Sequence, residues 1–327
     1  MPHTIRAMLA SLGMVLILPC ASQVMAADPA PGKDTPAAPA VERAPMLPRT
    51  QESALALESQ LPAADQQQLK AGEDSFLALW KPANSNDPKG AVIIVPGADE
   101  SANAPNIIGP MRQKFPDIGW SSLSITLPDQ VTDYTPARAA EPAPGEASGA
   151  DAKVAAKDAK PVEADPAARA EQEAAAETAR AAAADEQAKA QAERIFARIE
   201  SAIGFAQENK ARSIIVLGHG TGAYWAARYL SERPAPLVQK FVMVMARDPA
   251  QASPPLNAVV PTLKIKTADF IYKDQGIGRN DELERLQASK RNKGPEFRQI
   301  TLAASPGNNP GGQEQIFRRV RGWVEAE

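Results

Sequence analysis

The sequence predicts an α/β fold, a doubly wound and mostly parallel sheet with helices on both faces and a low-complexity helical insertion. Two stretches, residues 49–135 and 193–327, alternate short apolar runs with amphipathic segments. Several of these runs are continuously apolar, which is typical of parallel strands buried on both faces. The segment between the stretches, residues 136–192, is rich in Ala, Glu and Lys and interrupts the alternation. We therefore expect the two stretches to form the two parts of one domain.

The first stretch predicts three strands and one helix. A short strand is expected at Phe76–Trp80 and a continuously apolar strand at Ala91–Val95. The loop Pro96–Asp99 follows, and then a helix near Ala104–Lys114. The third strand is expected at Leu123–Leu127.

The second stretch continues the alternation. A helix that ends near Asn209 precedes a strand at Ser213–Leu217, and a glycine-rich turn then opens a helix that runs to about Glu232. The later elements are strands at Phe241–Met245, Thr262–Lys266 and Phe297–Leu302, a polar helix near Asp281–Arg291, and a final helix with Ile316, Phe317, Val320, Trp323 and Val324 on one stripe. Ligands of such sheets bind beyond the carboxyl ends of the strands, so the loops at that edge are the place to look for a site.

The insertion changes character along its length. Up to residue 164 it is a mixture of Ala, Pro, Lys and acidic residues and is expected to be disordered. From Asp165–Pro166, a suitable N-cap and first helical position, it becomes strong helix-forming sequence that runs into Ile195 and Phe196. This helix is either a solvated extension or an arm that binds a partner. Alanine at its inner positions buries little area, so it favours a coiled coil only weakly and leaves the oligomeric state open.

The N-terminus predicts export. Residues 1–26 have the features of a secretory signal peptide: His3 and Arg6 at a weakly basic start, an apolar run, and Val24-Met25-Ala26 before the cleavage point. Lipidation at Cys20 is disfavoured because Pro19 precedes it. Residues 27–48 are a Pro/Ala-rich linker that is expected to be disordered. We therefore expect a periplasmic protein with no transmembrane segment in its mature chain.

Charge and motif content exclude several classes of function. The net charge is −3 and the pI is about 5.7, which gives no basic footprint for nucleic acid or membrane. No metal-binding spacing of His or Cys, no calcium loop and no G-x-x-x-x-G-K-[ST] phosphate loop occurs. No cofactor and no metal is therefore expected, and the partner would be an unidentified protein or small ligand.

The glycine-rich turn Gly218–Gly222 has two interpretations. Gly218, Gly220 and Ala223 match the dinucleotide pattern G-x-G-x-x-A, and Asp248 could serve as the ribose acid. The motif nevertheless lies late in the chain, whereas this fingerprint normally opens its domain. The second interpretation is a nucleophile elbow, G-x-S-x-G, in which a strained turn raises a serine above the sheet.

In the elbow interpretation the flanking residues are present and the nucleophile is missing. Gly218 and Gly222 occupy the two small positions, but Gly220 stands where the serine would be. Thr221 lies one residue later and would contribute its backbone N–H to an oxyanion hole together with the loop at Gly97 and Ala98.

These blocks resemble a known family. Gly90–Gly97, Gly119–Pro128 and Gly218–Ala223 together are similar to the domain-of-unknown-function family 3530, whose members are α/β-hydrolase-like proteins exported by Gram-negative bacteria. The resemblance covers about residues 50–130 and 191–327. It implies an α/β-hydrolase-like fold and no established activity.

The hydrolase layout also requires an acid and a base. Asp269, after the strand expected at Thr262–Lys266, stands where the acid would be, although a surface or helix-capping role is favoured. The loop at residues 303–309, where the base would stand, has no histidine. The only histidines are His3 and His219, and His219 is expected to pack or form hydrogen bonds around the turn.

The leading hypothesis is therefore a non-catalytic binding or scaffold protein, a pseudo-hydrolase that engages a ligand or partner through the old crevice or the long helix. One alternative is a divergent esterase-type hydrolase that uses Thr221 or Ser305, with Asp269 or His219 in an unusual role. Another is a nucleotide-binding protein that uses Gly218–Ala223.

Overall fold

The computed structural model describes residues 47–129 and 166–327, apart from 234, 251, 274–277, 293–295, 304–306, 308 and 327. The predicted signal peptide, most of the linker and the first part of the insertion lie outside the described residues, as does Asp165. None of the described helices is long and apolar enough to cross a membrane.

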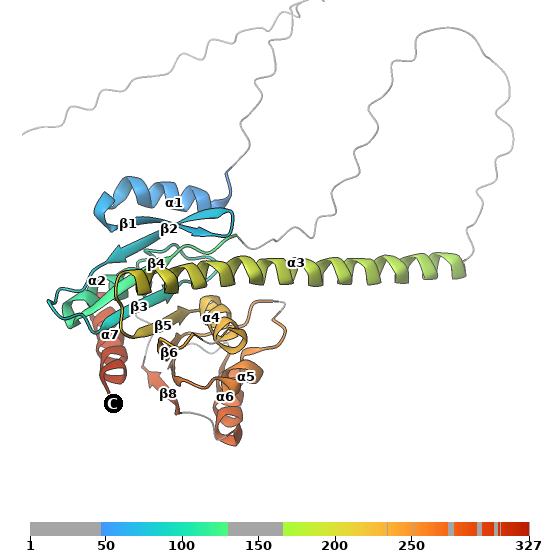
Figure 1. Ribbon diagram of the computed structural model, residues 1–327. Helices are drawn as coiled ribbons and strands as arrows, with labels where there is room; N and C mark the ends of the chain where they lie inside the picture. The colour runs from blue at the N-terminus through green and yellow to red at the C-terminus, as the bar shows by residue number, and fades with distance from the viewer. Residues whose placement is uncertain are drawn as a thin grey trace, which may run out of the picture. The chain divides into compact units, whose positions relative to one another are not determined.

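A single sheet of eight strands forms the centre of the structure (Figure 1). Its strands are β1 (Gln66–Ala71), β2 (Asp74–Lys81), β3 (Gly90–Val95), β4 (Trp120–Ile125), β5 (Ile214–His219), β6 (Val238–Val244), β7 (Lys266–Tyr272) and β8 (Phe297–Leu302). The spatial order is β1-β2-β4-β3-β5-β6-β7-β8. Strands β1 and β2 pair in antiparallel fashion at one edge, and all pairs from β4 to β8 are parallel.

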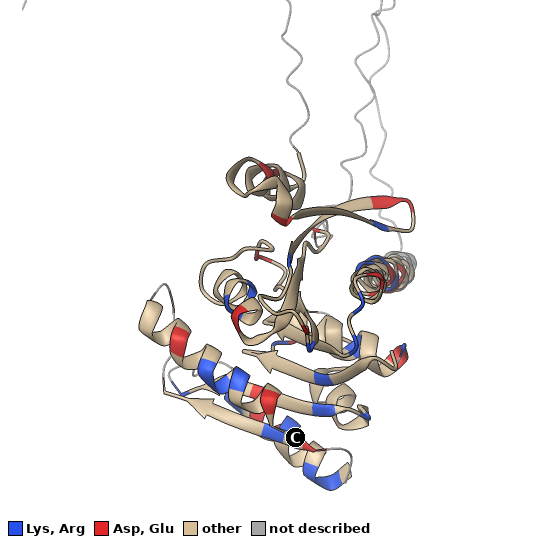
Figure 2. Cartoon of the chain, turned by 60° about the vertical axis from the view of Figure 1, so that its left-hand side comes forward, with Lys and Arg blue, Asp and Glu red and all other residues tan. Residues whose placement is uncertain are grey.

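The helices lie on both faces of this sheet, so the predicted doubly wound architecture is confirmed. They are α1 (Arg49–Gln60), α2 (Ile108–Lys114), α3 (Pro166–Glu208), α4 (Thr221–Glu232), α5 (Leu256–Val259), α6 (Arg279–Asn292) and α7 (Pro310–Glu325). Helices α3, α4 and α5 pack over one face, and α2 and α7 pack over the other. Both acidic and basic residues occur along several of these helices (Figure 2).

Alternation along each strand divides the apolar side chains between two cores. In β3, Ala91, Ile93 and Val95 face the core under α3 and α4, and Val92 and Ile94 face the core under α2 and α7. Successive side chains of a strand point to opposite faces, so a strand covered on both sides must be apolar at every position. The continuous apolar run that predicted β3 has this cause, and all six of its residues are buried.

Several elements differ from the predictions. Helix α1 and strand β1 were not predicted, because Arg49–Gln60 and Gln66–Ala71 are largely polar segments that bury few side chains. Helix α2 begins at Ile108 rather than near Ala104, and β4 ends at Ile125. The strand expected at Thr262–Lys266 is wrong: β7 begins where that strand was expected to end.

Helix α3 is continuous from Pro166 to Glu208 and crosses the predicted domain boundary at residue 192 without a break. Its residues 174–190 are exposed except for the half-buried Ala184 and Ala188, and burial begins at Gln191. Ile195, Phe196 and Ile199 then pack into the core. The helix thus combines an exposed arm with a segment that packs on the sheet.

Candidate functional site

A sharp turn joins β5 to α4 at the carboxyl edge of the sheet. Its central residue, Gly220, has φ of 54° and ψ of −125°, a region that side chains other than glycine adopt only under strain. The Gly220 N–H donates to the Val244 carbonyl at 3.0 Å, and its own carbonyl accepts from Arg247 N–H at 3.1 Å. The turn is therefore held by the segment that follows β6.

The two flanking glycines are required by close packing. A Cβ atom on Gly218 would stand 2.4 Å from Ala223 Cα, and one on Gly222 would stand 2.2 Å from the Pro96 carbonyl oxygen. A Cβ on Gly220, in contrast, would meet nothing closer than Gly97 Cα at 3.9 Å. The space that a nucleophile would need above the turn is therefore present, and the side chain is absent.

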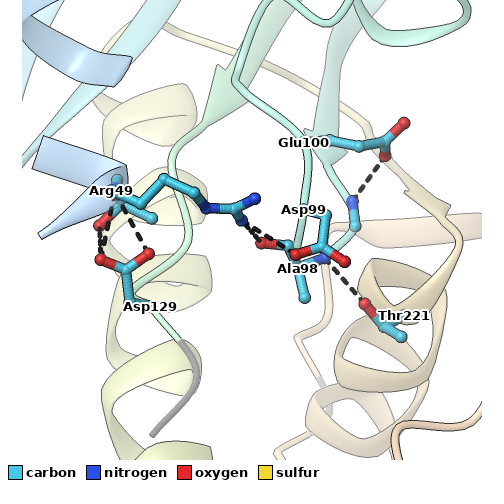
Figure 3. A network of polar contacts seen from close by, with 8 residues as sticks. Arg49, Ala98, Asp99, Glu100, Asp129 and Thr221 are labelled. Atoms are coloured by element: carbon cyan, nitrogen blue, oxygen red, sulfur yellow. Dashed lines mark hydrogen bonds and ion pairs between the residues drawn. The ribbon is translucent and has the colours of Figure 1, made fainter. Parts of the chain in front are cut away.

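The loop after β3 faces this turn (Figure 3). The Ala98 N–H donates to Thr221 Oγ1 at 2.9 Å. The sequence predicted the Ala98 amide as an oxyanion donor and Thr221 as a contributor of its backbone N–H. The structure brings the two residues together but uses the Thr221 hydroxyl as the acceptor for the Ala98 amide. An incoming oxyanion would have to displace that hydroxyl to reach this donor.

His219, the last residue of β5, is oriented by a carboxylate. Its Nδ1 lies 2.5 Å from Glu100 Oε2, and the same oxygen accepts the Gly97 N–H at 2.8 Å. Burial by itself raises the pKa of Glu100, but the hydrogen bond and charge of His219, the Gly97 amide and the charge of Arg247 outweigh it. The pKa of Glu100 is therefore lowered, and the carboxylate is ionised at neutral pH.

The other imidazole nitrogen is enclosed. His219 Nε2 is buried and has no hydrogen-bond partner among the residues that the structure describes. A carboxylate-oriented imidazole is half of a nucleophile-activating arrangement, which also needs a hydroxyl or thiol within reach of the free nitrogen. The adjacent Gly220 supplies none, so the pair as it stands holds the loop after β3 against the turn.

Asp269 occupies a different environment from the predicted one. It lies in the middle of β7 and is fully buried, so it is neither a residue in the loop after the strand nor a surface cap. Its Oδ2 accepts from Arg285 Nε at 3.2 Å and Nη2 at 3.1 Å, and from Gln299 Nε2 at 3.1 Å. These contacts connect β7 to α6 and β8, away from the edge at which chemistry would occur.

A small polar cavity of about 200 Å³ opens beyond the carboxyl ends of β6 and β7. Asp248, Asp281 and Glu282 line it with Arg247 and Tyr272. Burial raises the pKa of Asp248, whose Oδ1 accepts the Leu256 N–H at 2.9 Å, and burial followed by the charge of Asp269 raises the pKa of Glu282. Because Arg247 also holds the turn at Gly220, this cavity borders the crevice.

The remaining predicted site residue, Ser305, lies outside the described residues, as does most of the loop predicted to lack a base. In the described part of the chain, no group of three or more His, Cys, Asp or Glu side chains is arranged to hold a metal ion.

Two residues of the site were missed in the sequence. Glu100 lies in a loop that the strand-edge rule singled out, and its carboxylate was the available signal. Arg49 offered no signal, because α1 was not predicted and its partners are distant in sequence. Its Nη2 donates to the Ala98 carbonyl at 2.7 Å and lies 3.1 Å from Asp99 Oδ1, so α1 is attached to the loop that faces the turn (Figure 3).

Solved structures that are similar to this chain identify its fold. An esterase from Pyrococcus furiosus is similar over 80% of this chain and 89% of its own, with 13% identity and a TM-score of 0.51. Est1E from Butyrivibrio proteoclasticus is similar over 80% of this chain and 97% of its own, with 8% identity and a TM-score of 0.51. At such identities the likeness shows the α/β-hydrolase-like fold alone.

The sequence comparisons agree with the resemblance seen in the glycine blocks. No curated protein is significantly similar in sequence to this chain. The family model of DUF3530, described as a protein of unknown function, matches residues 8–326. The chain belongs to the DUF3530 family and has its α/β-hydrolase-like fold.

Proposed function

We propose that this chain is a non-catalytic binding protein that retains the crevice of a hydrolase without its chemistry. The observation that carries the proposal is the turn at Gly220, which has the backbone conformation and the open space of a nucleophile elbow but no nucleophile. Glycine adopts this conformation without strain, so the turn needs no side chain at this position to keep its shape. The turn then positions backbone amides and neighbouring side chains for binding.

Two further contacts support this proposal. The Ala98 amide, one of the expected oxyanion donors, is already bonded to the Thr221 hydroxyl. The carboxylate that orients His219 also bonds Gly97, so the imidazole contributes to holding the loop. The polar cavity beside the turn, about 200 Å³ in volume, is the space in which we expect a small polar ligand.

Fluorophosphonate labelling of the purified chain, alongside a short-chain ester assay, tests the proposal. We expect neither stoichiometric labelling nor turnover in protein shown by circular dichroism to be folded. An active serine hydrolase serves as the positive control for the reagent. Labelling that is abolished in Thr221→Ala or Ser305→Ala would contradict the proposal and identify the substitute nucleophile of a divergent esterase.

Titration with ATP and NAD tests the remaining alternative, a nucleotide-binding protein. A saturable thermal shift that disappears in Gly222→Ala would favour nucleotide binding at Gly218–Ala223, provided that the variant folds. Gly218→Ala, in which the new Cβ would crowd Ala223 on the other side of the turn, should abolish the same thermal shift.

We also propose that the chain is exported to the periplasm. The basic start, the apolar run and the small residues before Ala27 support this proposal. Expression with a C-terminal tag, followed by osmotic-shock fractionation and N-terminal sequencing, should give periplasmic protein that begins at Ala27. A chain that remains in the cytoplasm with residues 1–26 attached would contradict it, and a Cys20→Ala variant should be processed like the wild type.

A further inference from the structure

A second cavity has no lining residue in common with the turn or with the cavity beyond β6 and β7. It has a volume of about 570 Å³ and lies between α1, the β1–β2 hairpin, the segment after β4 and the packed part of α3. Its apolar surface includes Leu55 and Phe76, and its basic residues are Arg194 and Arg198 on consecutive turns of α3. A cavity of this size holds a small organic molecule.

Arg198 is the unusual residue of this cavity. It is 8% exposed, its Nη1 donates to the Thr126 carbonyl at 2.7 Å, and its guanidinium lies 5.0 Å from the centre of the Phe76 ring. No carboxylate of the described residues lies within ion-pair distance of it. A buried cation without an ionic partner is costly, and the usual remedy is an anion brought next to it.

Its environment increases that cost. Burial, followed by repulsion from Arg194, lowers the pKa of Arg198 to about 10. Arg194 itself forms an ion pair with Asp74, at 3.5 Å, in which both side chains are about half exposed and which therefore contributes little. Arg194 and Arg198 thus line one cavity, and the attraction of Asp74 and Asp129 on Arg198 is smaller than the effects of burial and of Arg194.

The carboxylates of the cavity are occupied elsewhere. Asp129 accepts the Thr50 N–H at 3.1 and 3.2 Å and the Thr50 hydroxyl at 3.0 Å, which caps α1. Glu58 accepts from Gln68 at 2.6 Å. The guanidinium of Arg198 is therefore the charged group that remains for a guest, although three acidic residues line the cavity, Glu58, Asp74 and Asp129, against two basic ones.

We propose that this cavity binds a single-chain amphiphile with a carboxylate head group. The carboxylate would contact Arg198, with Arg194 beside it, because a planar guanidinium binds a carboxylate through paired N–H donors. The chain would lie over Phe76 and Leu55, and Leu55 is a large apolar side chain left 49% exposed at the rim. This site is independent of the crevice and does not rest on the absence of catalysis.

Calorimetric titration of the full chain with decanoate, below the concentration at which it forms micelles, tests this site. We expect one decanoate per chain and an affinity at least tenfold above those for decanol and decyltrimethylammonium, which share the tail and lack the negative charge. Acetate, which has the head group alone, should bind at least tenfold more weakly. Absence of saturable decanoate binding, or equal affinity for the cationic amphiphile, would overturn the proposal.

Variants locate the binding. Arg198→Gln should lower the affinity for decanoate at least tenfold, and Arg194→Gln should lower it less. Leu55→Asp, at an exposed position where folding is not at stake, should also weaken binding at least fivefold by placing a negative charge at the rim. Arg212→Gln, remote from the cavity and 64% exposed, is the matched control and should leave the affinity unchanged. Binding that is the same in Leu55→Asp and in the control would show that the cavity is not the site.

Discussion

At the scale of single residues, three glycines in one turn have different physical roles. Gly218 and Gly222 are required because backbone atoms stand where a side chain would begin, whereas Gly220 is required only by its dihedral angles. The motif by itself does not distinguish these cases, because all three positions read as glycine. The distinction matters for function, since Gly220 is the position at which a side chain would have room to act.

Substitution should separate these roles. Gly220→Ser should fold and lose about 1–3 kcal/mol, the usual cost of a strained backbone conformation. Gly222→Ser should lose more than about 3 kcal/mol, because its Cβ would overlap the Pro96 carbonyl. Urea unfolding measures both. We expect no ester hydrolysis in Gly220→Ser, and strong turnover there would show that a base is already in place.

The pH dependence of stability should report on Glu100. Its folded-state pKa is lowered, so the stabilisation from its ionised form is fully present above the ordinary carboxyl pKa of about 4.3 and is lost as the pH falls through the folded value. Glu100→Gln should lower the free energy of unfolding by about 2 kcal/mol at pH 7 and by progressively less as the pH falls through the folded-state pKa of Glu100. The exposed Glu208→Gln is the control. A difference that does not depend on pH would contradict this assignment.

At the scale of elements, burial differs between segments that look alike in sequence. Helix α3 reads as one strong helix-forming segment, yet only the part from Gln191 onward packs on the sheet. Strands β7 and β8 show the reverse, because segments that are partly polar in sequence are held in the packed sheet. Their sequences include polar residues, but Asp269 Oδ2 accepts hydrogen bonds from both Arg285 and Gln299, and these bonds hold both strands together with α6.

Hydrogen exchange should divide α3 into two parts. Amides of residues 174–188 should exchange rapidly, because a helix segment without tertiary packing is marginal in water. Amides of residues 194–206 should be protected to nearly the global free energy of unfolding. Mass spectrometry of peptides from the two parts measures this, and equal protection along the helix would indicate that the arm is covered by another chain.

Breaking the buried ion pair between Asp269 of β7 and Arg285 of α6 should destabilise the chain strongly, whereas replacing both residues with apolar ones should destabilise it little. Asp269→Ala leaves the guanidinium of Arg285 buried without its partner and should destabilise the chain by about 3–5 kcal/mol. The double variant Asp269→Leu/Arg285→Met should recover most of that loss. If Asp269→Ala unfolds at the wild-type urea concentration, the pair contributes nothing to stability.

At the scale of the whole molecule, one sheet serves two cores. Trp80 and Trp225 are buried in the core under α3 and α4, and Trp120 and Trp323 are buried in the core under α2 and α7. Every parallel strand from β3 to β6 contributes side chains to both cores, so one face cannot lose its packing without disturbing the other.

Unfolding should therefore be cooperative across the sheet. Tryptophan fluorescence of the wild type should show a single transition in urea. In Trp80→Phe/Trp225→Phe and in Trp120→Phe/Trp323→Phe the remaining tryptophans report on one core each. In each variant the fluorescence midpoint should coincide with the main circular-dichroism transition of the same variant. Far-ultraviolet circular dichroism should in addition show an early loss of signal from the arm of α3. Two separate fluorescence midpoints would show that the cores unfold independently.

The sequence by itself determined the alternation of elements, the parallel sheet and the glycine at position 220, because these depend on local periodicity and on single residue identities. Strand β8 and helix α4 were placed correctly for that reason. The tertiary structure decided the position of β7, the existence of α1 and β1, the contact of His219 with Glu100, and the burial of Arg198 and Asp269. Each of these depends on residues distant in the chain, and a side chain's burial and partners are properties of the packed molecule rather than of its neighbours in sequence.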